Sequence, residues 1–307
     1  MNRVAAVDCG TNSVRLLIAD LAPDGTLTDV ERRMEIVRLG QGVDQTGRLT
    51  PEALERTFAA MRGYAALITR HGAEKVRVVA TSATRDAANR ADFVAGVVEI
   101  FDVVPEVITG DEEAELSFTG ATRELAALRP VGPYLVVDIG GGSTEFVLGG
   151  SHVEAARSMD IGCVRMTERH MRDADPPSPE QITAAVADID VALATVRESV
   201  PVDESRTLVG LAGSVTTVSA IAHGLETYEP DKIHLSRVTA AQVHEVTRDL
   251  LHATRAERAA LGVMHPGRVD VIGAGALILD RIMREYSFGA VLVSEHDILD
   301  GIAWSLA

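Results

Sequence analysis

Lysine is nearly absent from this sequence of 307 residues: only Lys75 and Lys232 are lysines among 29 basic residues, so the other 27 are arginines. The basic residues are outnumbered by 45 acidic residues, which gives a formal net charge of −16. This charge argues against duplex nucleic acid or an anionic membrane as the main partner, because both would repel the protein. It does not exclude an anionic ligand in a locally basic cleft, since guanidinium groups suit phosphate oxygens.

Cysteines and long apolar runs are also scarce. Cys9 and Cys163 cannot form a disulfide framework or a zinc site by themselves. No run reaches the roughly 18 apolar residues of a transmembrane helix, and the N-terminus lacks the apolar stretch and cleavage site of a signal peptide. We therefore expect a cytoplasmic protein without a membrane partner, and its 46% of hydrophobic residues suffice for two domains of ordinary size.

An internal repeat is the most informative pattern that is present. Residues 4–19, VAAVDCGTNSVRLLIA, and residues 134–149, YLVVDIGGGSTEFVLG, each contain an apolar strand, an aspartate, a turn of small residues and a second apolar strand. Asp8 matches Asp138, and Arg15 matches Glu145 on the returning strand. A repeat of this length is not typical of a solenoid and favours two duplicated α/β domains.

Alternating helices and strands follow each copy of the repeat, which is typical of a partly parallel sheet. Thr50 and Pro51 predict a helix that runs to about residue 71, and Ser178 with Gln181 predicts a second helix start with a capping box. We place the boundary in the stretch 121–129, so that the domains comprise residues 1–123 and 124–294. A terminal helix at about 295–307 is expected to pack back on the first domain.

The turn in each copy of the repeat is suited to phosphate. Successive backbone N–H groups at such a turn can point into one concavity that binds phosphate oxygens, and neighbouring hydroxyls add donors. The candidate phosphate-binding residues are Thr11, Asn12 and Ser13 in the first turn and Gly140, Gly141, Gly142 and Ser143 in the second. Further candidates are Arg15 and, in the segment GLAGSVTT, Gly213 and Ser214, although ordinary close packing of a helix explains that segment almost as well.

Three acids accompany the two turns. A carboxylate beside bound phosphate is repulsive unless a divalent cation bridges the two, and Mg²⁺ is commonly held by one or two carboxylates together with phosphate oxygens. Asp138 and Glu145, with Asp8 from the other copy, therefore form the predicted magnesium set. A glycine-rich turn with incidental acids is the alternative, and the repetition of the pattern disfavours it.

A cluster of acids in ITGDEEAEL, residues 108–116, begins a predicted helix. Acids favour the positive end of a helix dipole, and Thr109 with Glu112 forms a capping box, which leaves Glu113 without a structural role. A carboxylate that orients or deprotonates water is what hydrolysis of a phosphoanhydride needs. Arg85, in the segment TSATRDAANRADF after a buried strand, is a candidate phosphate contact; an ion pair with a nearby aspartate is its alternative.

Six segments occur in the order seen in the exopolyphosphatase and guanosine pentaphosphate phosphohydrolase (Ppx/GppA) family, which the whole chain resembles. They are VDCGTNSVRLLIA, ATSATRDAANRADF, VITGDEEAEL, VVDIGGGSTEFVLG, GLAGSVTT and SEHDILDGI. That family belongs to the superfamily of actin, the sugar kinases and the heat-shock ATPases. The resemblance implies an α/β fold with two ribonuclease-H-like (actin-like ATPase) domains around a central cleft.

The resemblance also implies residue roles. Glu113 matches the catalytic glutamate of the family, and Arg85 matches an arginine that contacts substrate phosphates. The remaining matched positions are the metal-binding acids Asp138 and Glu145 and the phosphate-loop residues Asn12, Ser13, Gly140, Gly141, Gly142 and Ser143. His296 and Asp297 are not read as a metal motif; we expect them to cap the terminal helix.

The activity implied by the resemblance is Mg²⁺-dependent hydrolytic release of terminal phosphate from inorganic polyphosphate. We expect short chains to be preferred, because the net charge is acidic and the further helical domain of longer family members has no counterpart here. The alternatives are a pppGpp 5'-phosphohydrolase, a non-catalytic sensor that binds (p)ppGpp, and a phosphotransferase between polyphosphate and ATP. A homodimer is also expected.

Overall fold

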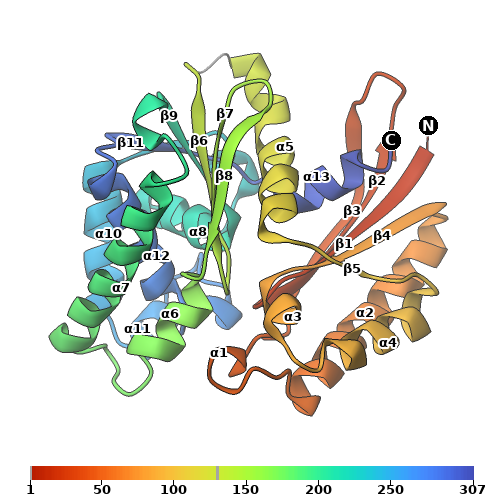
Figure 1. Ribbon diagram of the computed structural model, residues 1–307, viewed down its shortest axis with the longest axis horizontal. Helices are drawn as coiled ribbons and strands as arrows, with labels where there is room; N and C mark the ends of the chain where they lie inside the picture. The colour runs from red at the N-terminus through yellow and green to blue at the C-terminus, as the bar shows by residue number, and fades with distance from the viewer. Residues whose placement is uncertain (1, 129–130) are drawn as a thin grey trace. The chain divides into compact units, whose positions relative to one another are not determined.

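The structure is a computed structural model that describes residues 2–128 and 131–307 (Figure 1). It divides into two compact units: unit 1 consists of Met1–Gly120 with Asp297–Ala307, and unit 2 consists of Ala121–His296. The stretch 121–129 in which the boundary was expected includes residue 129, which lies outside the described residues. Whether each unit folds by itself as a domain stays a prediction.

Unit 1 contains a five-stranded sheet in the order β3-β2-β1-β4-β5. The first three strands are antiparallel neighbours, whereas β4 pairs in parallel with β1 and β5 in parallel with β4. The strands are β1 (Asn2–Cys9), β2 (Ser13–Leu21), β3 (Leu27–Ile36), β4 (Lys75–Ala80) and β5 (Glu106–Val107). The helices are α1 (Val43–Thr46), α2 (Pro51–His71), α3 (Ser82–Asp86), α4 (Arg90–Phe101), α5 (Gly110–Leu128), which continues into unit 2, and α13 (Ile298–Trp304).

The two faces of this sheet bury different sets of residues, because side chains alternate along a strand. On β1, Ala5 and Val7 join the core beneath α2 and α4, whereas Val4 and Ala6 join a smaller core beneath α13. Figure 1 shows α2 and α4 on one face of the sheet and α13 on the other. A strand that is apolar on both faces is therefore covered on both faces.

Unit 2 contains a six-stranded sheet in the order β10-β11-β9-β6-β7-β8. Its strands are β6 (Tyr134–Ile139), β7 (Thr144–Gly149), β8 (Val153–Met159), β9 (Thr207–Leu211), β10 (Arg237–Thr239) and β11 (Ala290–Val293). Its helices are α6 (Cys163–His170), α7 (Pro179–Arg197), α8 (Ala212–Ala222), α9 (Pro230–Ile233), α10 (Ala240–His252), α11 (Arg255–Ala259) and α12 (Ile272–Glu285), with short 3-10 turns at Val202–Glu204 and Pro266–Arg268.

The two sheets share one topology. The run β8-β7-β6-β9-β11 in unit 2 repeats the order β3-β2-β1-β4-β5 of unit 1, with the same parallel and antiparallel neighbours. This order is that of the ribonuclease-H-like fold, so the predicted α/β class with two such domains is confirmed. The central cleft stays a prediction.

Helix starts that depend on local contacts follow the sequence. The side chain of Thr50 accepts from the N–H of Ala53 at the start of α2, and Ser178 forms the predicted capping box with Gln181 at the start of α7. After β4 the chain forms the short helix α3, and α4 begins at Arg90 after residues 87–89. The short elements α6 and β10 were not predicted.

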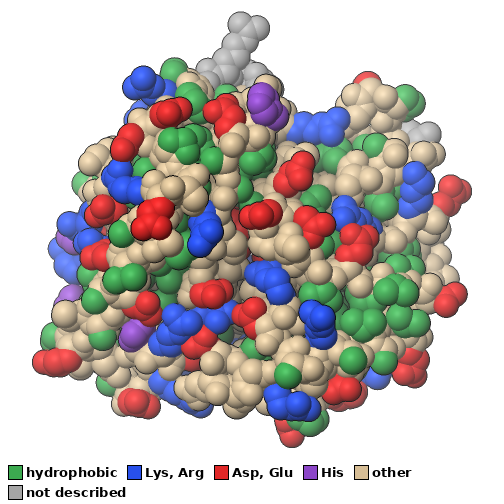
Figure 2. All heavy atoms as spheres, viewed as in Figure 1, with side chains coloured by type: hydrophobic (Ala, Val, Ile, Leu, Met, Phe, Trp, Pro, Cys, Tyr) green, Lys and Arg blue, Asp and Glu red, His purple; other side chains and the backbone are tan. Residues whose placement is uncertain are grey.

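In residues 2–128 and 131–307, no helix has the length and apolar character needed to cross a bilayer. On the face drawn in Figure 2, lysine and arginine side chains are interspersed with aspartate and glutamate on both units.

Candidate functional site

The two copies of the repeat form two hairpins with the same turn geometry. In β1–β2 the N–H of Gly10 donates to the carbonyl of Ser13 over 3.0 Å, and in β6–β7 the N–H of Gly140 donates to the carbonyl of Ser143 over the same distance. In each hairpin the aspartate of the first strand lies opposite the residue at the matching position of the second strand. The predicted internal duplication is therefore present at the level of single hydrogen bonds.

The carbonyl groups of the second turn point into the start of helix α6. The N–H groups of Cys163, Val164 and Gly162 donate to the carbonyls of Gly140, Gly141 and Gly142 over 2.9, 2.8 and 3.2 Å respectively. In a trans peptide the carbonyl and the following N–H point in opposite directions. The N–H groups of Gly141, Gly142 and Ser143 therefore face away from α6, as the predicted phosphate concavity requires.

The first turn is oriented in the same manner by a different segment. The N–H of Gly40 donates to the carbonyl of Thr11 over 2.8 Å, and the N–H groups of Val37 and Arg38 donate to the carbonyl of Asn12 over 3.0 and 2.9 Å. The N–H groups of Asn12 and Ser13 consequently face the other side of the turn. Both sequence-predicted phosphate loops thus direct backbone donors to one side.

Two facing carboxylates characterise the second hairpin. Asp138 and Glu145 lie directly opposite each other on β6 and β7, so their side chains project from the same face of the sheet. They are 7% and 1% exposed, and the hydroxyl of Ser158 donates to Glu145 Oε1 over 2.7 Å. Hard carboxylate oxygens in this arrangement fit the requirements of Mg²⁺.

Asp138 and Glu145 are the two acidic side chains of the second hairpin that could bind a metal ion. Across residues 2–128 and 131–307, no group of three or more His, Cys, Asp or Glu side chains is arranged to hold a metal ion. A cation at Asp138 and Glu145 would therefore complete its coordination with water and phosphate oxygens, as Mg²⁺ commonly does.

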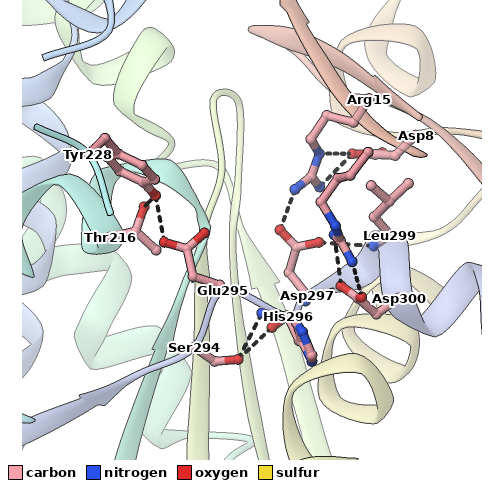
Figure 3. Close-up of polar contacts among 11 residues, drawn as sticks. Asp8, Arg15, Thr216, Tyr228, Ser294, Glu295, His296, Asp297, Leu299 and Asp300 are labelled. Carbon is pink, nitrogen blue, oxygen red and sulfur yellow. Dashed lines mark hydrogen bonds and ion pairs between the residues drawn. The ribbon is translucent and has the colours of Figure 1, made fainter. Parts of the chain in front are cut away.

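In the first hairpin, the basic residue Arg15 lies opposite the acidic residue Asp8. Arg15 donates through Nε and Nη2 to Asp8 Oδ2, over 2.9 and 2.6 Å, and through Nη1 to Asp297. Figure 3 shows the Arg15 guanidinium between these two carboxylates. Because its three nitrogens are engaged within unit 1, the geometry favours a structural role for Arg15 over the phosphate contact that we expected.

Asp8 keeps one oxygen without a hydrogen bond. Its side chain is 3% exposed, and Oδ1 has no hydrogen-bond partner among the described residues. Burial raises the pKa of Asp8, and the charge of Arg15 opposes that rise only in part. Oδ1 is thus the one atom of Asp8 that suits a bound water or cation.

The same ion-pair network caps helix α13. Asp297 accepts from the N–H of Leu299 over 3.0 Å, and its own N–H donates to Asp300 over 3.0 Å, while Asp300 pairs with Arg32 from β3. Burial alone would raise the pKa of Asp297, but the Arg15 charge and the N–H of Leu299 outweigh burial and lower it. The expectation that Asp297 caps the terminal helix is confirmed.

Glu113 and Arg85, predicted separately, are brought together. Arg85 Nη1 donates to Glu113 Oε2 over 3.1 Å and to the carbonyl of Ile108 over 3.0 Å, and Glu113 is 8% exposed. Its neighbour Glu112 forms the predicted capping box with Thr109, whose N–H lowers the pKa of Glu112. The partner of Arg85 is thus Glu113, not a neighbouring aspartate.

The third candidate turn, at Gly213 and Ser214, is tightly packed. A Cβ atom at Gly213 would lie 2.1 Å from the guanidinium of Arg268, and one at Gly275 would lie 2.2 Å from Ser214 Oγ. This close packing is compatible with the alternative interpretation, and a phosphate contact at Gly213 and Ser214 stays a prediction. Near the following helix α8, the hydroxyl of Tyr228 donates to Glu295 and accepts from the hydroxyl of Thr216 (Figure 3).

Sequence reasoning missed the residues that hold the loops from behind. Gly162 and Arg165 contact the second loop through the folded chain, and no motif marks them. Asp297 was expected to cap the terminal helix, but its contact with Arg15 was not predicted. The only available signal for Gly162 and Arg165 was their spacing, because the segments 37–40 and 162–165 each follow the third strand of a repeat copy. Such a signal needs the positions of the strands beforehand.

Each unit thus has a ribonuclease-H-like sheet, a strand–turn–strand loop with backbone N–H groups on one side, and a buried aspartate on the strand before the loop. A sequence model described as the Ppx/GppA phosphatase family matches residues 17–307. The chain belongs to this family.

Relatives cover the chain from end to end. A protein named exopolyphosphatase 2 from Mycobacterium tuberculosis is 51% identical over 319 aligned residues, which cover 100% of this chain and 99% of that protein. The crystal structure of an exopolyphosphatase from Cytophaga hutchinsonii aligns with a TM-score of 0.90 at 25% identity, over 99% of this chain and 97% of that one. A structure of the Aquifex aeolicus PPX-GPPA enzyme aligns with a TM-score of 0.82 at 33% identity, over 99% of both chains.

Proposed function

We propose that this protein is an exopolyphosphatase, which hydrolyses the terminal phosphoanhydride bond of inorganic polyphosphate. The observation that carries the proposal is the second hairpin, where three backbone N–H groups and two facing buried carboxylates lie at one turn. Two adjacent acids repel phosphate unless a divalent cation lies between them. The name of the Mycobacterium tuberculosis relative supports the same substrate.

Each residue has a separate task in the proposed reaction. The N–H groups of the two loops hold terminal phosphate oxygens, and Glu113, oriented by Arg85, positions a water molecule and accepts its proton. The water oxygen forms a bond to the terminal phosphorus while the bridging P–O bond breaks. The electron pair of that bond leaves with the shortened polyphosphate, and inorganic phosphate is released.

Magnesium is the cation that we propose, held by Asp138 and Glu145. A role for Asp8 as a third ligand stays a prediction. When bound, Mg²⁺ supplies positive charge to the phosphate oxygens. The chain's own contribution is the pairing of the two acids on facing strands, which would hold the cation next to the loop.

Phosphate release measured with Mg²⁺ tests the proposal, with short polyphosphate, long polyphosphate and pppGpp offered at equal concentrations of chain ends. Release from polyphosphate, faster on short chains, is the expected result. Release from pppGpp alone would instead identify an alarmone phosphohydrolase. Tight binding without release would favour a (p)ppGpp sensor, and transfer to ADP without free phosphate would identify a phosphotransferase.

A matched pair of variants tests the role of Glu113. Glu113→Gln should reduce turnover by on the order of a hundredfold, the contribution typical of a general base, while binding of polyphosphate persists. Glu112→Gln, one residue away in the exposed capping box, should leave turnover within about twofold, because surface substitutions have small effects. Equal activity of the two variants would remove Glu113 from the mechanism.

Two further proposals concern the oligomeric state of the protein and its location in the cell. A homodimer is tested by the mass of the protein in solution, and a cytoplasmic location by fractionation of the cell. Neither bears on the reaction itself.

A further inference from the structure

Arg165 is bound to the glycine loop from the side opposite the proposed phosphate. Its Nε donates to the carbonyl of Gly142 over 2.7 Å, and its backbone N–H donates to the carbonyl of Gly141 over 3.1 Å. The side chain is 11% exposed, and its other guanidinium end lies 3.7 Å from Asp160, whose side chain is 70% exposed. The short contact to Gly142 is thus shielded from water, whereas the contact to Asp160 is long and solvated.

The carbonyl of Gly142 shares its peptide group with the N–H of Ser143. A charged donor on a carbonyl forms a stronger bond than a neutral donor, and hydrogen bonds in a chain polarise one another. The positive charge of Arg165 therefore makes the N–H of Ser143 a stronger donor towards an anion on the other side. The same bond also restricts rotation of this peptide, so that the N–H keeps its direction.

Helix α6 can reach the loop only because Gly162 has no side chain. A Cβ atom there would lie 2.2 Å from the carbonyl oxygen of Gly141 and 2.4 Å from the nitrogen of Gly142. Thr144, at the far end of the loop, donates to the carbonyl of Ile161 over 2.7 Å. Residues 161–165 thus form a rigid backing for the loop, and Arg165 is its charged member.

We propose that Arg165 is a positioning residue, which directs and polarises the Ser143 N–H through the Gly142 carbonyl and thereby sets the affinity for the phosphate end of the substrate. The proposal rests on the proposed function, because it takes the second loop as the phosphate-binding element. Arg165 does not touch the substrate. Its effect is expected on binding and not on the chemical step, since the Ser143 N–H contacts phosphate before and during the reaction.

Three substitutions separate geometry from charge. In Arg165→Gln, the amide nitrogen occupies the same position along the side chain as Nε of arginine, so the bond to Gly142 is kept and the charge is lost. Arg165→Met has a similar length but removes both, and Arg165→Lys keeps the charge. Loss of a charge-assisted hydrogen bond corresponds to about a tenfold change in affinity. We therefore expect KM for polyphosphate to rise about tenfold in Arg165→Met and less in Arg165→Gln. In Arg165→Lys, KM should lie between the values of the parent and of Arg165→Met.

The experiment measures kcat and KM for polyphosphate and the dissociation constant of inorganic phosphate for all three variants, together with the melting temperature. The expected result is a graded rise in KM and in the phosphate dissociation constant, with kcat within about twofold, as for uniform binding. Arg169→Met is the matched control, because Arg169 lies on the same helix and donates to Asp188 over 3.3 Å. It should leave KM unchanged.

Several outcomes would overturn the proposal. One is an unchanged KM in Arg165→Met, and another is an equal rise in Arg165→Met and Arg169→Met, which would indicate a weakened helix α6. Asp138→Asn distinguishes failure of the proposed function from failure of this inference. If Asp138→Asn is inactive while Arg165→Met retains its KM, only the role of Arg165 is wrong; if Asp138→Asn is fully active, the loop is not the phosphate site and both proposals fall.

Discussion

The two hairpins share a backbone and differ in the charge opposite the aspartate. In unit 1, Asp8 faces Arg15 and its charge is balanced within the chain, whereas in unit 2, Asp138 faces Glu145. An acid that faces a base forms a stable ion pair without any ligand. Two facing acids carry like charges, which an external cation or an added proton relieves, and this is the hairpin to which we assign the proposed cation.

The difference also explains the unequal attachment of the two hairpins. Arg15 is held by Asp8 and by Asp297 at the start of α13, and this links the first loop to the C-terminal helix. The second loop is instead held by backbone donors from α6 and by Arg165. Backbone donors hold both loops, but the first hairpin also has the buried ion pairs of Arg15, whereas the second loop has the charged donor Arg165.

Removal of the facing acid in unit 2 should have the largest effect. Glu145→Gln is expected to reduce phosphate release by on the order of a thousandfold, because a divalent cation contributes several kcal/mol of charge stabilisation. Without metal, the variant should be at least as stable as the parent, since one of two like charges is gone. Mg²⁺ binding by calorimetry and thermal denaturation in chelator measure both, with the exposed Glu154→Gln on β8 as control; Mg²⁺ affinity equal to the parent's would exclude Glu145 as a ligand.

Removal of the base in unit 1 should instead affect stability. Arg15→Gln leaves Asp8 and Asp297 buried without their counter-charge, and loss of one partner of a buried pair costs about 3 kcal/mol. Urea denaturation measures the free energy of unfolding. A loss below about 1 kcal/mol, the value typical of surface pairs, would show that the network is not the support of the first loop.

The glycine that packs behind each loop should tolerate a side chain to a different degree. A Cβ atom at Gly162 would meet the backbone of Gly141 at 2.2 Å, whereas one at Gly40 would first meet the side chain of Thr11 at 2.3 Å. Gly162→Ala should therefore destabilise the protein by about 2 kcal/mol and raise KM, in the range of overpacked sites. Gly40→Ala should cost less, because a side chain can rotate; equal losses by thermal denaturation would contradict this difference.

The smallest expected effect is on the pH dependence of stability, which should differ between the parent and Arg15→Gln. In the parent, the pKa of Asp297 is lower in the folded state than in the unfolded state, where it is about 3.9. Asp297 therefore stabilises the fold above about pH 3.9, and this stabilisation is lost as the pH falls through the folded-state pKa. The pKa of Asp8 is already raised by burial in the parent. In Arg15→Gln, loss of the counter-charge raises it further and raises that of Asp297 as well, so the variant gains stability as pH falls toward about 4. The difference between parent and variant should shrink by about 1 kcal/mol between pH 7 and pH 4.5; a difference independent of pH would contradict it.

The sequence predicted contacts correctly only between residues that are close to each other in the chain. Thr50, Ser178 and the Thr109–Glu112 pair act on N–H groups within the same turn, so a short segment is sufficient to identify them. The repeat similarly identified both loops, because each is one hairpin. The contact between Arg85 and Glu113 joins residues 28 positions apart, and the sequence predicted each role without predicting that they meet.

Other features needed long-range contacts. The sequence alone matched Arg15 to Glu145 and suggested a phosphate contact, whereas the folded chain brings Asp297 to Arg15 from 282 residues away. Gly162 and Arg165 belong to a short helix with no motif of its own, and only the packing of that helix on the loop relates them to the site.

The amino-acid sequence by itself determined the duplicated α/β architecture, the two turns and the acids beside them, because apolar periodicity, glycine conformation and helix capping act over a few residues. Only the tertiary structure decided which charges are already paired inside the protein and which are available to a ligand. Pairing depends on which elements meet in space, and a buried charge is stabilised or destabilised by those neighbours and not by its neighbours in the chain.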